Sequence, residues 1–381
     1  MKTWVEISRD NIARNIKSLK SLLKPDVKFM AVLKSNAYGH GLEAVGKICV
    51  QGQQVDWFGV DNIDEALTLR KAAVKQSILV LGYIPLERIG EAIGADISFV
   101  AYNTELLDYL AKLPSSDKKN KKAKIHIKVE TGTARQGIAD EELLEFANKA
   151  SKNPKIFVEG IYTHFSNIED TTDSSFAIEQ LKKFDESITI VGGILHRSAH
   201  QSNKLIKHSA CSAAIINYPA THFDMVRAGI SLYGYWPSPE TKAVAKEKGV
   251  RLELKPAMTW KTRIAQIKKL KINTPVGYGL TETVKRDSRV AVLPIGYWDG
   301  YDRKLSSIGE VLIRNKRAKI LGRICMNMAI ADVTDIPKAR VFDEVVLLGR
   351  GITADELAKK IGTINYEVVT RINPLIRRIM V

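Results

Sequence analysis

Residues 28–41 read KFMAVLKSNAYGHG, and this stretch is the first unit of a repeating pattern. KFMAVL is a short apolar run typical of a buried parallel strand, and SNAYGHG is a loop of small residues that contains glycine. Similar apolar runs follow up to residue 228, with helical patterns such as 63–73 and 141–152 between them. They lie at 57–60, 78–81, 97–101, 124–129, 157–162, 204–207 and 225–228. Eight such units predict an α/β fold that begins with a (β/α)8 TIM barrel.

The pattern changes near residue 240. Residues 236–248 (WPSPETKAVAKEK) are charged and contain proline, as is typical of a connector between domains. Apolar runs separated by turns follow at 258–268, 289–295, 310–313, 318–324, 328–333 and 344–348, and only 354–361 has a clear helical pattern. We therefore predict a barrel at 10–240 and a mostly antiparallel β domain at 241–381, with residues 1–9 pairing with the second domain. Residues 188–200 are interpreted as an extra turn or strand.

Length and composition exclude several classes of protein. A chain of 381 residues suits two domains, and its apolar runs are too short to span a membrane. The first twenty residues lack the apolar core of a secretory signal, and the three cysteines are too scattered for a disulfide framework or a zinc site. These features predict a cytoplasmic protein without a metal. The densest basic cluster, at 118–124, has no interleaved aromatic residues, so the net charge of +16 is interpreted as solvated surface, and no nucleic-acid partner is expected.

The barrel prediction directs attention to the strand ends, because functional residues of this fold lie at the carboxyl ends of its strands. Lys34 directly follows the first strand. Burial there would favour its neutral amine, which can bind the carbonyl group of a cofactor covalently. The alternative interpretation is a lysine whose charged end reaches solvent.

Other strand ends strengthen the first interpretation. Lys128 and Arg135 follow the fifth strand, His164 ends the sixth, Ser212 opens a helix after the seventh, and Arg227 ends the eighth. The backbone N–H groups of residues 229–231 then offer an anion site, as loops after strands seven and eight commonly do in this fold. This set of residues predicts a phosphorylated cofactor held by a lysine.

VLKSNAYGHG resembles the pyridoxal-phosphate attachment motif of the alanine racemase family, which is a fold-type III family of pyridoxal-phosphate enzymes. The resemblance continues in order through KVETGTARQGI, EGIYTHFSN, HSACSAA, FDMVRAGISLYG, VGYGLTE, PIGYWDGYDR, GRICMNM and TINYEV. It implies a barrel followed by a β domain, and an isomerase that interconverts L- and D-alanine and supplies D-alanine for cell-wall peptidoglycan.

The resemblance also implies the catalytic residues. Lys34 would bind the cofactor and act as the base on the D-face, and Tyr278 would act on the L-face from the other subunit of a homodimer. Two bases suit a racemase, because the α-proton leaves from one face and returns on the other. Arg227 would hydrogen-bond the ring nitrogen of the cofactor, and His164 would link Arg227 to Tyr278. Without the family, Tyr278 reads as an exposed turn residue and His164 as a structural histidine.

Further roles follow from the same motifs. Arg135 would contact the phenolic oxygen of the cofactor and the substrate carboxylate, and Lys128 matches a position that is often carbamylated, although an unmodified lysine is the alternative. The backbone of Met326 would meet the substrate carboxylate, and Tyr297 and Tyr366 would form a narrow gate that favours alanine. The implied phosphate contacts come from side chains and from the loop after strand eight: Tyr38, Ser212, Gly229, Ile230, Ser231 and Tyr366.

Two departures from the family pattern leave alternatives open. Cys211 stands where asparagine is usual, beside the predicted phosphate site, and Asn327 replaces an aspartate near the substrate entrance. They bear on cofactor affinity and substrate breadth, so a serine or broad-specificity racemase remains an alternative. A basic-amino-acid decarboxylase is disfavoured by Arg227, and a non-catalytic pyridoxal-phosphate carrier by the presence of the β domain.

Overall fold

The computed structural model describes residues 1–381 except 52–54, 114–120, 171 and 199–204. The described chain forms two compact units. The barrel unit contains residues 12–35 and 45–255, and the β unit contains residues 1–11, 36–44 and 256–381. The domain border set between residues 240 and 241 stays a prediction. Lys118, Lys119 and Lys204, which entered the sequence predictions, lie outside the described residues.

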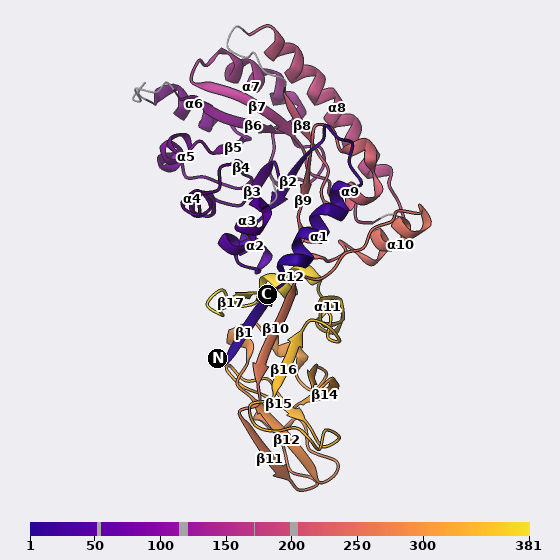
Figure 1. The fold of residues 1–381 in the computed structure, drawn as a ribbon. Coiled ribbons are helices and arrows are strands. Elements are labelled where there is room, and N and C mark those ends of the chain that lie inside the picture. Colours follow the sequence, from indigo (N-terminus) through magenta and orange to yellow (C-terminus); the bar gives the residue numbers. More distant parts are fainter. Residues whose placement is uncertain (52–54, 114–120, 171, 199–204) are drawn as a thin grey trace. The chain divides into compact units, whose positions relative to one another are not determined.

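The barrel unit is built on eight parallel strands in the order β8-β7-β6-β5-β4-β3-β2-β9 (Figure 1). The two ends of this sheet meet, because Asp224 N–H donates to Lys207 O at 3.0 Å and Arg227 N–H donates to Ala210 O at 3.0 Å. The predicted barrel is thus confirmed as a nearly closed one. Its strands are β2 (Lys28–Val32), β3 (Trp57–Val60), β4 (Ser77–Val80), β5 (Ser98–Ala101), β6 (Ala123–Lys128), β7 (Ile156–Tyr162), β8 (Ile206–His208) and β9 (Met225–Ala228).

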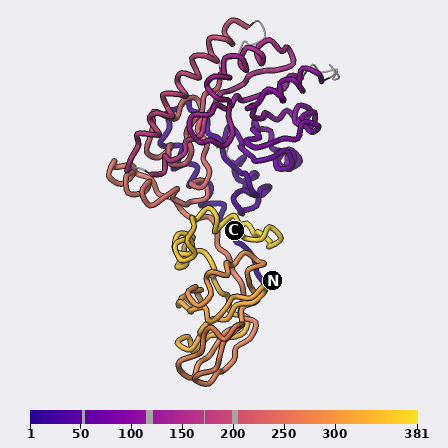
Figure 2. The backbone as a smooth tube through the Cα atoms, turned by 180° about the vertical axis from the view of Figure 1, so that it is seen from behind, coloured from indigo at the N-terminus to yellow at the C-terminus, as the bar shows by residue number. Residues whose placement is uncertain are grey.

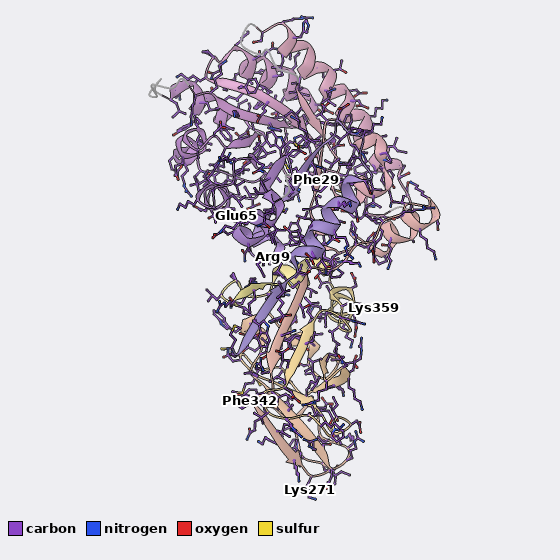
Figure 3. All side chains as sticks on the ribbon, viewed as in Figure 1. Arg9, Phe29, Glu65, Lys271, Phe342 and Lys359 are labelled. Carbon is purple, nitrogen blue, oxygen red and sulfur yellow. The ribbon has the colours of Figure 1, made fainter. Side chains whose placement is uncertain are left out.

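Helices between the strands cover the outside of this barrel (Figure 1). Several begin at polar caps, as where Asn62 accepts a hydrogen bond from Glu65 N–H. The fully buried aromatic rings include Phe29 on β2, which is labelled in Figure 3, Phe58 on the neighbouring β3, and Phe99 on β5. The helices are α1 (Arg9–Lys20), α3 (Leu42–Val50), α4 (Ile63–Lys71), α5 (Ile89–Gly94), α6 (Thr104–Lys112), α7 (Asp140–Lys152), α8 (Ser175–His196), α9 (Ser212–Asn217) and α10 (Pro239–Glu247).

One sequence interpretation in this unit was wrong. Residues 188–196 are the second half of α8 rather than a turn or strand, and residues 199–200 of that stretch lie outside the described part. Val191 and Leu195 are buried at helical spacing, which explains the helix. The connector contains α10, which begins where the Ser238 hydroxyl accepts from Thr241 N–H at 2.9 Å.

The β unit contains a nine-stranded sheet in the order β11-β12-β15-β14-β13-β16-β10-β1-β17. Its pairs are antiparallel except for β1 with β17, so the predicted mostly antiparallel domain is confirmed. Figure 2 shows the indigo residues at the N-terminus running within this later part of the chain. The strands are β1 (Thr3–Ile7), β10 (Met258–Arg263), β11 (Gln266–Leu270), β12 (Ser288–Leu293), β13 (Glu310–Ile313), β14 (Lys316–Leu321), β15 (Ala329–Asp332), β16 (Glu344–Leu348) and β17 (Arg378–Met380).

Three details of the β unit differ from the sequence prediction. The apolar run at 258–268 is split between β10 and β11, and Lys271 lies just beyond β11 in the loop labelled in Figure 3. Besides the expected helix α11 (Ala354–Ile361), the unit contains the short helix α12 (Asn365–Thr370). Strand β17 was also not predicted. Among the described residues of both units, no helix has the length and apolarity needed to cross a membrane.

Candidate active site

Lys34 stands at the carboxyl end of β2, where the chain enters an unusual turn. The short element α2 (Lys34–Tyr38) is left-handed, because Ser35, Asn36, Ala37 and Tyr38 have φ values of 56°, 56°, 54° and 50°. Residues other than glycine rarely adopt this conformation, and a run of four is more unusual still. Asn36 closes the turn by accepting from Gly41 N–H and Leu42 N–H, both at 2.9 Å. The lysine is therefore followed by a fixed turn.

The surroundings of Lys34 favour its neutral amine. Burial lowers the pKa of Lys34 below the usual lysine value, Arg135 adds to this effect, and Asp61 and Glu65 partly oppose it. A lysine with a lowered pKa holds more of the unprotonated amine that can attack a carbonyl group.

Arg378 anchors the left-handed turn within the β unit. Its Nε donates to Gly39 O at 3.0 Å, and its Nη atoms donate to the backbone oxygens of Ile372, Asn373 and Ile376. Gly39 has a φ of 80°, and a Cβ added there would lie 2.2 Å from Val369 O. The sequence analysis missed Arg378, because nothing in its local pattern points to a residue 339 positions away.

Arg227 on β9 is a buried cation, and only 4% of it is exposed. Its Nη1 donates to His208 Nδ1 at 2.8 Å and to His208 O, and its Nη2 donates to Thr163 O and Ser209 O at 2.8 Å. The guanidinium also lies over the Tyr162 ring, 5.1 Å from its centre. Nε makes no hydrogen bond within the described part of the chain, so one N–H of a rigidly held group remains for a ligand.

His164 lies beside Arg227, with Nδ1 3.4 Å from Nη2. The two Nη2 hydrogens point to the closer backbone oxygens of Thr163 and Ser209, so this longer contact is a secondary one. Burial and the charges of Arg227 and Arg135 place the pKa of His164 well below its usual value, so the ring is neutral. Tyr278 belongs to the β unit and is 71% exposed. The link from His164 to Tyr278 stays a prediction.

Lys128 is the last residue of β6, and Arg135 lies in the loop that follows it. Glu130 organises this loop, because its carboxylate accepts from the backbone N–H groups of Gly132, Thr133 and Arg135 at 2.6, 2.5 and 3.3 Å. Lys128 is buried, and its Nζ donates to Gln136 Oε1 at 2.9 Å. Burial, with further effects of Arg135 and Arg227, lowers the pKa of Lys128 to about 8.

Ser212 and the loop after β9 form a polar group at the predicted phosphate site. Ser212 is buried at the start of α9, and its hydroxyl accepts from Gly229 N–H at 3.0 Å and from Ser231 N–H at 3.4 Å. Ile230 between them is fully buried. Burial raises the pKa of the neighbouring Cys211 thiol to about 11, so this departure from the family pattern adds no charge at neutral pH.

The remaining predicted residues lie in the β unit. The rings of Tyr38 and Tyr366 lie 6.2 Å apart between centres and are tilted by 50°. Tyr297 N–H donates to Cys325 O at 3.1 Å, beside the exposed Met326. Gly296 permits this approach, because a Cβ there would lie 2.2 Å from Cys325 O. Tyr297 and Met326 thus lie on adjoining segments, and Asn327 is exposed next to them.

Comparison with known proteins covers both units. Residues 7–237 match the model of the alanine racemase N-terminal domain, and residues 257–380 match that of the alanine racemase C-terminal domain. An alanine racemase of Leptospira interrogans is 39% identical over 387 residues, which cover 100% of this chain and 96% of the relative.

Solved structures of alanine racemases are similar to this chain over its whole length. An alanine racemase of Clostridium difficile 630 has a TM-score of 0.91 and 34% identity, covering 100% of this chain and 96% of its own. The alanine racemase of Bacillus anthracis with bound L-Ala-P has a TM-score of 0.90 and 32% identity, covering 100% and 95%. A chain matched in this way over its two units belongs to the alanine racemase family.

Proposed function

We propose that this protein interconverts L- and D-alanine with pyridoxal phosphate bound covalently to Lys34. The observation that carries the proposal is a lysine of lowered pKa at the end of β2, in a barrel whose last strand, β9, presents the buried Arg227. The full-length similarity to alanine racemases supports alanine as the substrate. We further propose that the protein is cytoplasmic and that its D-alanine serves cell-wall peptidoglycan.

The donors of the barrel unit fit pyridoxal phosphate. Arg227 keeps its Nε–H for the ring nitrogen. The Ser212 hydroxyl accepts from the N–H groups of Gly229 and Ser231, which leaves its own proton to donate to the phosphate. Tyr38 and Tyr366 would add phenol contacts to the phosphate from the β unit, and Arg135 would contact the cofactor oxygen and the substrate carboxylate. When bound, this cofactor withdraws electrons from the substrate and makes its Cα proton acidic.

Two proton carriers would complete the reaction. Lys34 Nζ would take or return the Cα proton on the D-face, and the Tyr278 oxygen would do so on the L-face. We place Tyr278 in the partner's active site, in a homodimer with two shared sites. Support comes from the large apolar side chains that the β unit exposes, since interfaces bury such side chains. Its exposed members include Tyr278, Leu280, Trp298, Met326, Met328 and Leu375.

Chiral analysis of a panel of L-amino acids tests this function. We expect alanine to be converted fastest and serine more slowly, with lysine and arginine nearly inert, because Tyr297 and Tyr366 would crowd a long side chain. The Asn327→Asp variant is the matched control, since it restores the charge usual in the family. Equal rates on arginine and alanine would assign a broad-specificity racemase instead, and no D-product from any substrate would reject the function.

Replacing Arg227 by glutamate is expected to change the outcome of the reaction more than cofactor binding. Arginine leaves the ring nitrogen unprotonated, whereas a carboxylic acid shares a proton with it and strengthens electron withdrawal. We expect racemisation to fall by about 100-fold or more and the transamination-to-racemisation ratio to rise. Pyruvate and D-alanine assays measure both, with Arg227→Lys as the control that keeps the charge. Normal racemisation by Arg227→Glu would contradict the assigned role.

Carbamylation of Lys128 is expected to depend on pH. Carbon dioxide reacts with the neutral amine, and a pKa of about 8 makes that form abundant only above neutral pH. A carbon-13 carbamate signal from labelled bicarbonate should therefore grow from pH 7 to pH 9 and vanish near pH 6. Lys128→Arg is the control, because it keeps the charge and cannot be carbamylated. A signal that persists in this variant would come from another lysine.

A further inference from the structure

A chain of hydrogen bonds leads from Arg227 through the interior of the barrel. His208 Nδ1, on β8, accepts from Arg227 Nη1 at 2.8 Å, and His208 Nε2 lies 2.8 Å from His126 Nδ1 on β6. His126 Nε2 lies 3.4 Å from Glu159 Oε2 on β7, which also accepts from the Ser98 hydroxyl at 2.5 Å. The chain of hydrogen bonds therefore connects four adjacent strands of the barrel, β6 to β9. His126 and His208 are fully buried.

The direction of these bonds follows from the two ends of the chain. Arginine can only donate, so His208 Nδ1 must accept and the His208 proton lies on Nε2. That proton is donated to His126 Nδ1, which leaves the His126 proton on Nε2 for the Glu159 carboxylate. Neither ring can carry a second proton without placing two hydrogens in one contact. Burial and the charge of Arg227 also hold the pKa of His208 well below its usual value.

Neighbouring residues hold the rings in this arrangement. The Tyr162 ring stacks on His208 with 4.8 Å between centres and 3° between planes, and Trp57 meets His126 edge-on at 5.3 Å. Gly160 leaves space for His126, because a Cβ there would lie 2.3 Å from Nδ1. This packing, which depends on the glycine at 160, fixes the orientation of the His126 and His208 rings as well as their hydrogen-bond distances.

Glu159 supplies the negative charge of the chain. The hydrogen-bond acceptors around the Arg227 guanidinium are all neutral, and a buried cation is stabilised when a carboxylate is coupled to it. Burial alone would raise the pKa of Glu159, but its interactions with His126, then with the Ser98 hydroxyl and the charge of Lys124, lower it below the usual value. Glu159 is therefore ionised at neutral pH, at the far end of two polarised imidazoles.

We propose that His208, His126 and Glu159 are positioning residues that fix the orientation of Arg227 and moderate its positive charge through a one-way chain of hydrogen bonds. The proposal rests on the proposed function, because Arg227 is taken to face the ring nitrogen. It follows that Glu159, which does not contact Arg227, sets how strongly Arg227 Nε donates. A weaker donor would restrain electron withdrawal and keep side reactions rare.

Ring nitrogen-15 spectra of histidine-labelled protein, with cofactor bound, test the direction of the chain without a variant. We expect His126 and His208 to be neutral with the proton on Nε2. His222 is an internal reference, because its Nε2 lies 3.1 Å from the backbone oxygen of Ile215, to which it can only donate. A proton on Nδ1 of His208, or a charged ring at either position, would overturn the proposal.

Glu159→Gln tests the charge, since the amide oxygen can still accept from His126. We expect the KM for alanine to stay within about twofold, while the transamination-to-racemisation ratio rises about fivefold as Arg227 becomes a stronger donor. The control is Glu169→Gln, a half-buried glutamate of the same unit with no hydrogen bond to either histidine. An unchanged ratio in a folded Glu159→Gln protein rejects the charge role. Absence of racemisation in the unaltered protein would reject the proposed function instead, and the nitrogen spectra would still report on the chain.

Discussion

Lys34→Ala is expected to abolish racemisation, with kcat lower by about 10⁴-fold or more, because the variant loses both the cofactor linkage and one of the two bases. Borohydride reduction of the unaltered protein, followed by peptide mapping, should place the cofactor on Lys34. In Lys34→Ala the reduced adduct should be missing, while cofactor held through Arg227 and the phosphate contacts is removed by dialysis. Lys71→Ala, at the end of α4, is the control and should keep its adduct and its activity. Label on another lysine of the unaltered protein would disprove the assignment.

Mixing two inactive variants is expected to restore activity if each site is shared between subunits. Lys34→Ala and Tyr278→Phe homodimers each lack one base at both sites. In a mixed dimer, the site that keeps Lys34 receives an intact Tyr278 from its neighbour, and the other site lacks both bases. Random exchange makes about half of the dimers mixed, so roughly a quarter of the unaltered activity should return. Racemisation after verified subunit exchange is the measurement.

The mixing experiment distinguishes a site shared between two subunits from a site formed within one chain. If Lys34 and Tyr278 acted within one chain, no site in the mixture would be complete and activity would stay absent. The double variant Lys34→Ala/Tyr278→Phe, mixed with unaltered protein, provides the control. Its mixed dimers contain no complete shared site, whereas bases acting within one chain would leave the unaltered subunit fully active.

The barrel could be predicted because its strands are short apolar runs that parallel pairing buries on both faces. The failure at 188–196 has a local cause. Residues such as Ile188, Ile190 and Val191 have high strand propensity, and Gly192–Gly193 suggests a turn. Packing decides instead for a helix, since Phe184, Val191 and Leu195 bury one helical face. The start of α10 was recognisable, because Ser238-Pro239 is a helix-start signal that we read as part of a connector.

The site was only partly predictable for a different reason. Residues such as Lys34 and Arg227 stand at strand ends, where the fold itself indicates function. His126 and His208 lie within or at the end of strands, and their roles depend on which strands become neighbours. The spacing of His126 and Lys128 along β6 was a usable signal. Residues two apart face the same side of a strand, so His126 could have been expected on the same face as the predicted site residue Lys128. The pairing of His126 with Glu159 and with His208, 82 positions away, follows only from the closed sheet.

The left-handed turn at residues 35–38 bears on the order of events during synthesis of the protein. Such a conformation costs about 1–2 kcal/mol for each residue that is not glycine, so the local sequence does not adopt it unaided. Arg378 and the Val369 backbone, which contact Gly39, are added by the ribosome more than three hundred residues later, as the separation of 339 between Gly39 and Arg378 shows. When Lys34 leaves the ribosome, the residues that hold the turn at 35–38 in place have therefore not yet been synthesised. Cofactor capture becomes a late step, and a chain interrupted before residue 369 carries the lysine without the turn that fixes its place.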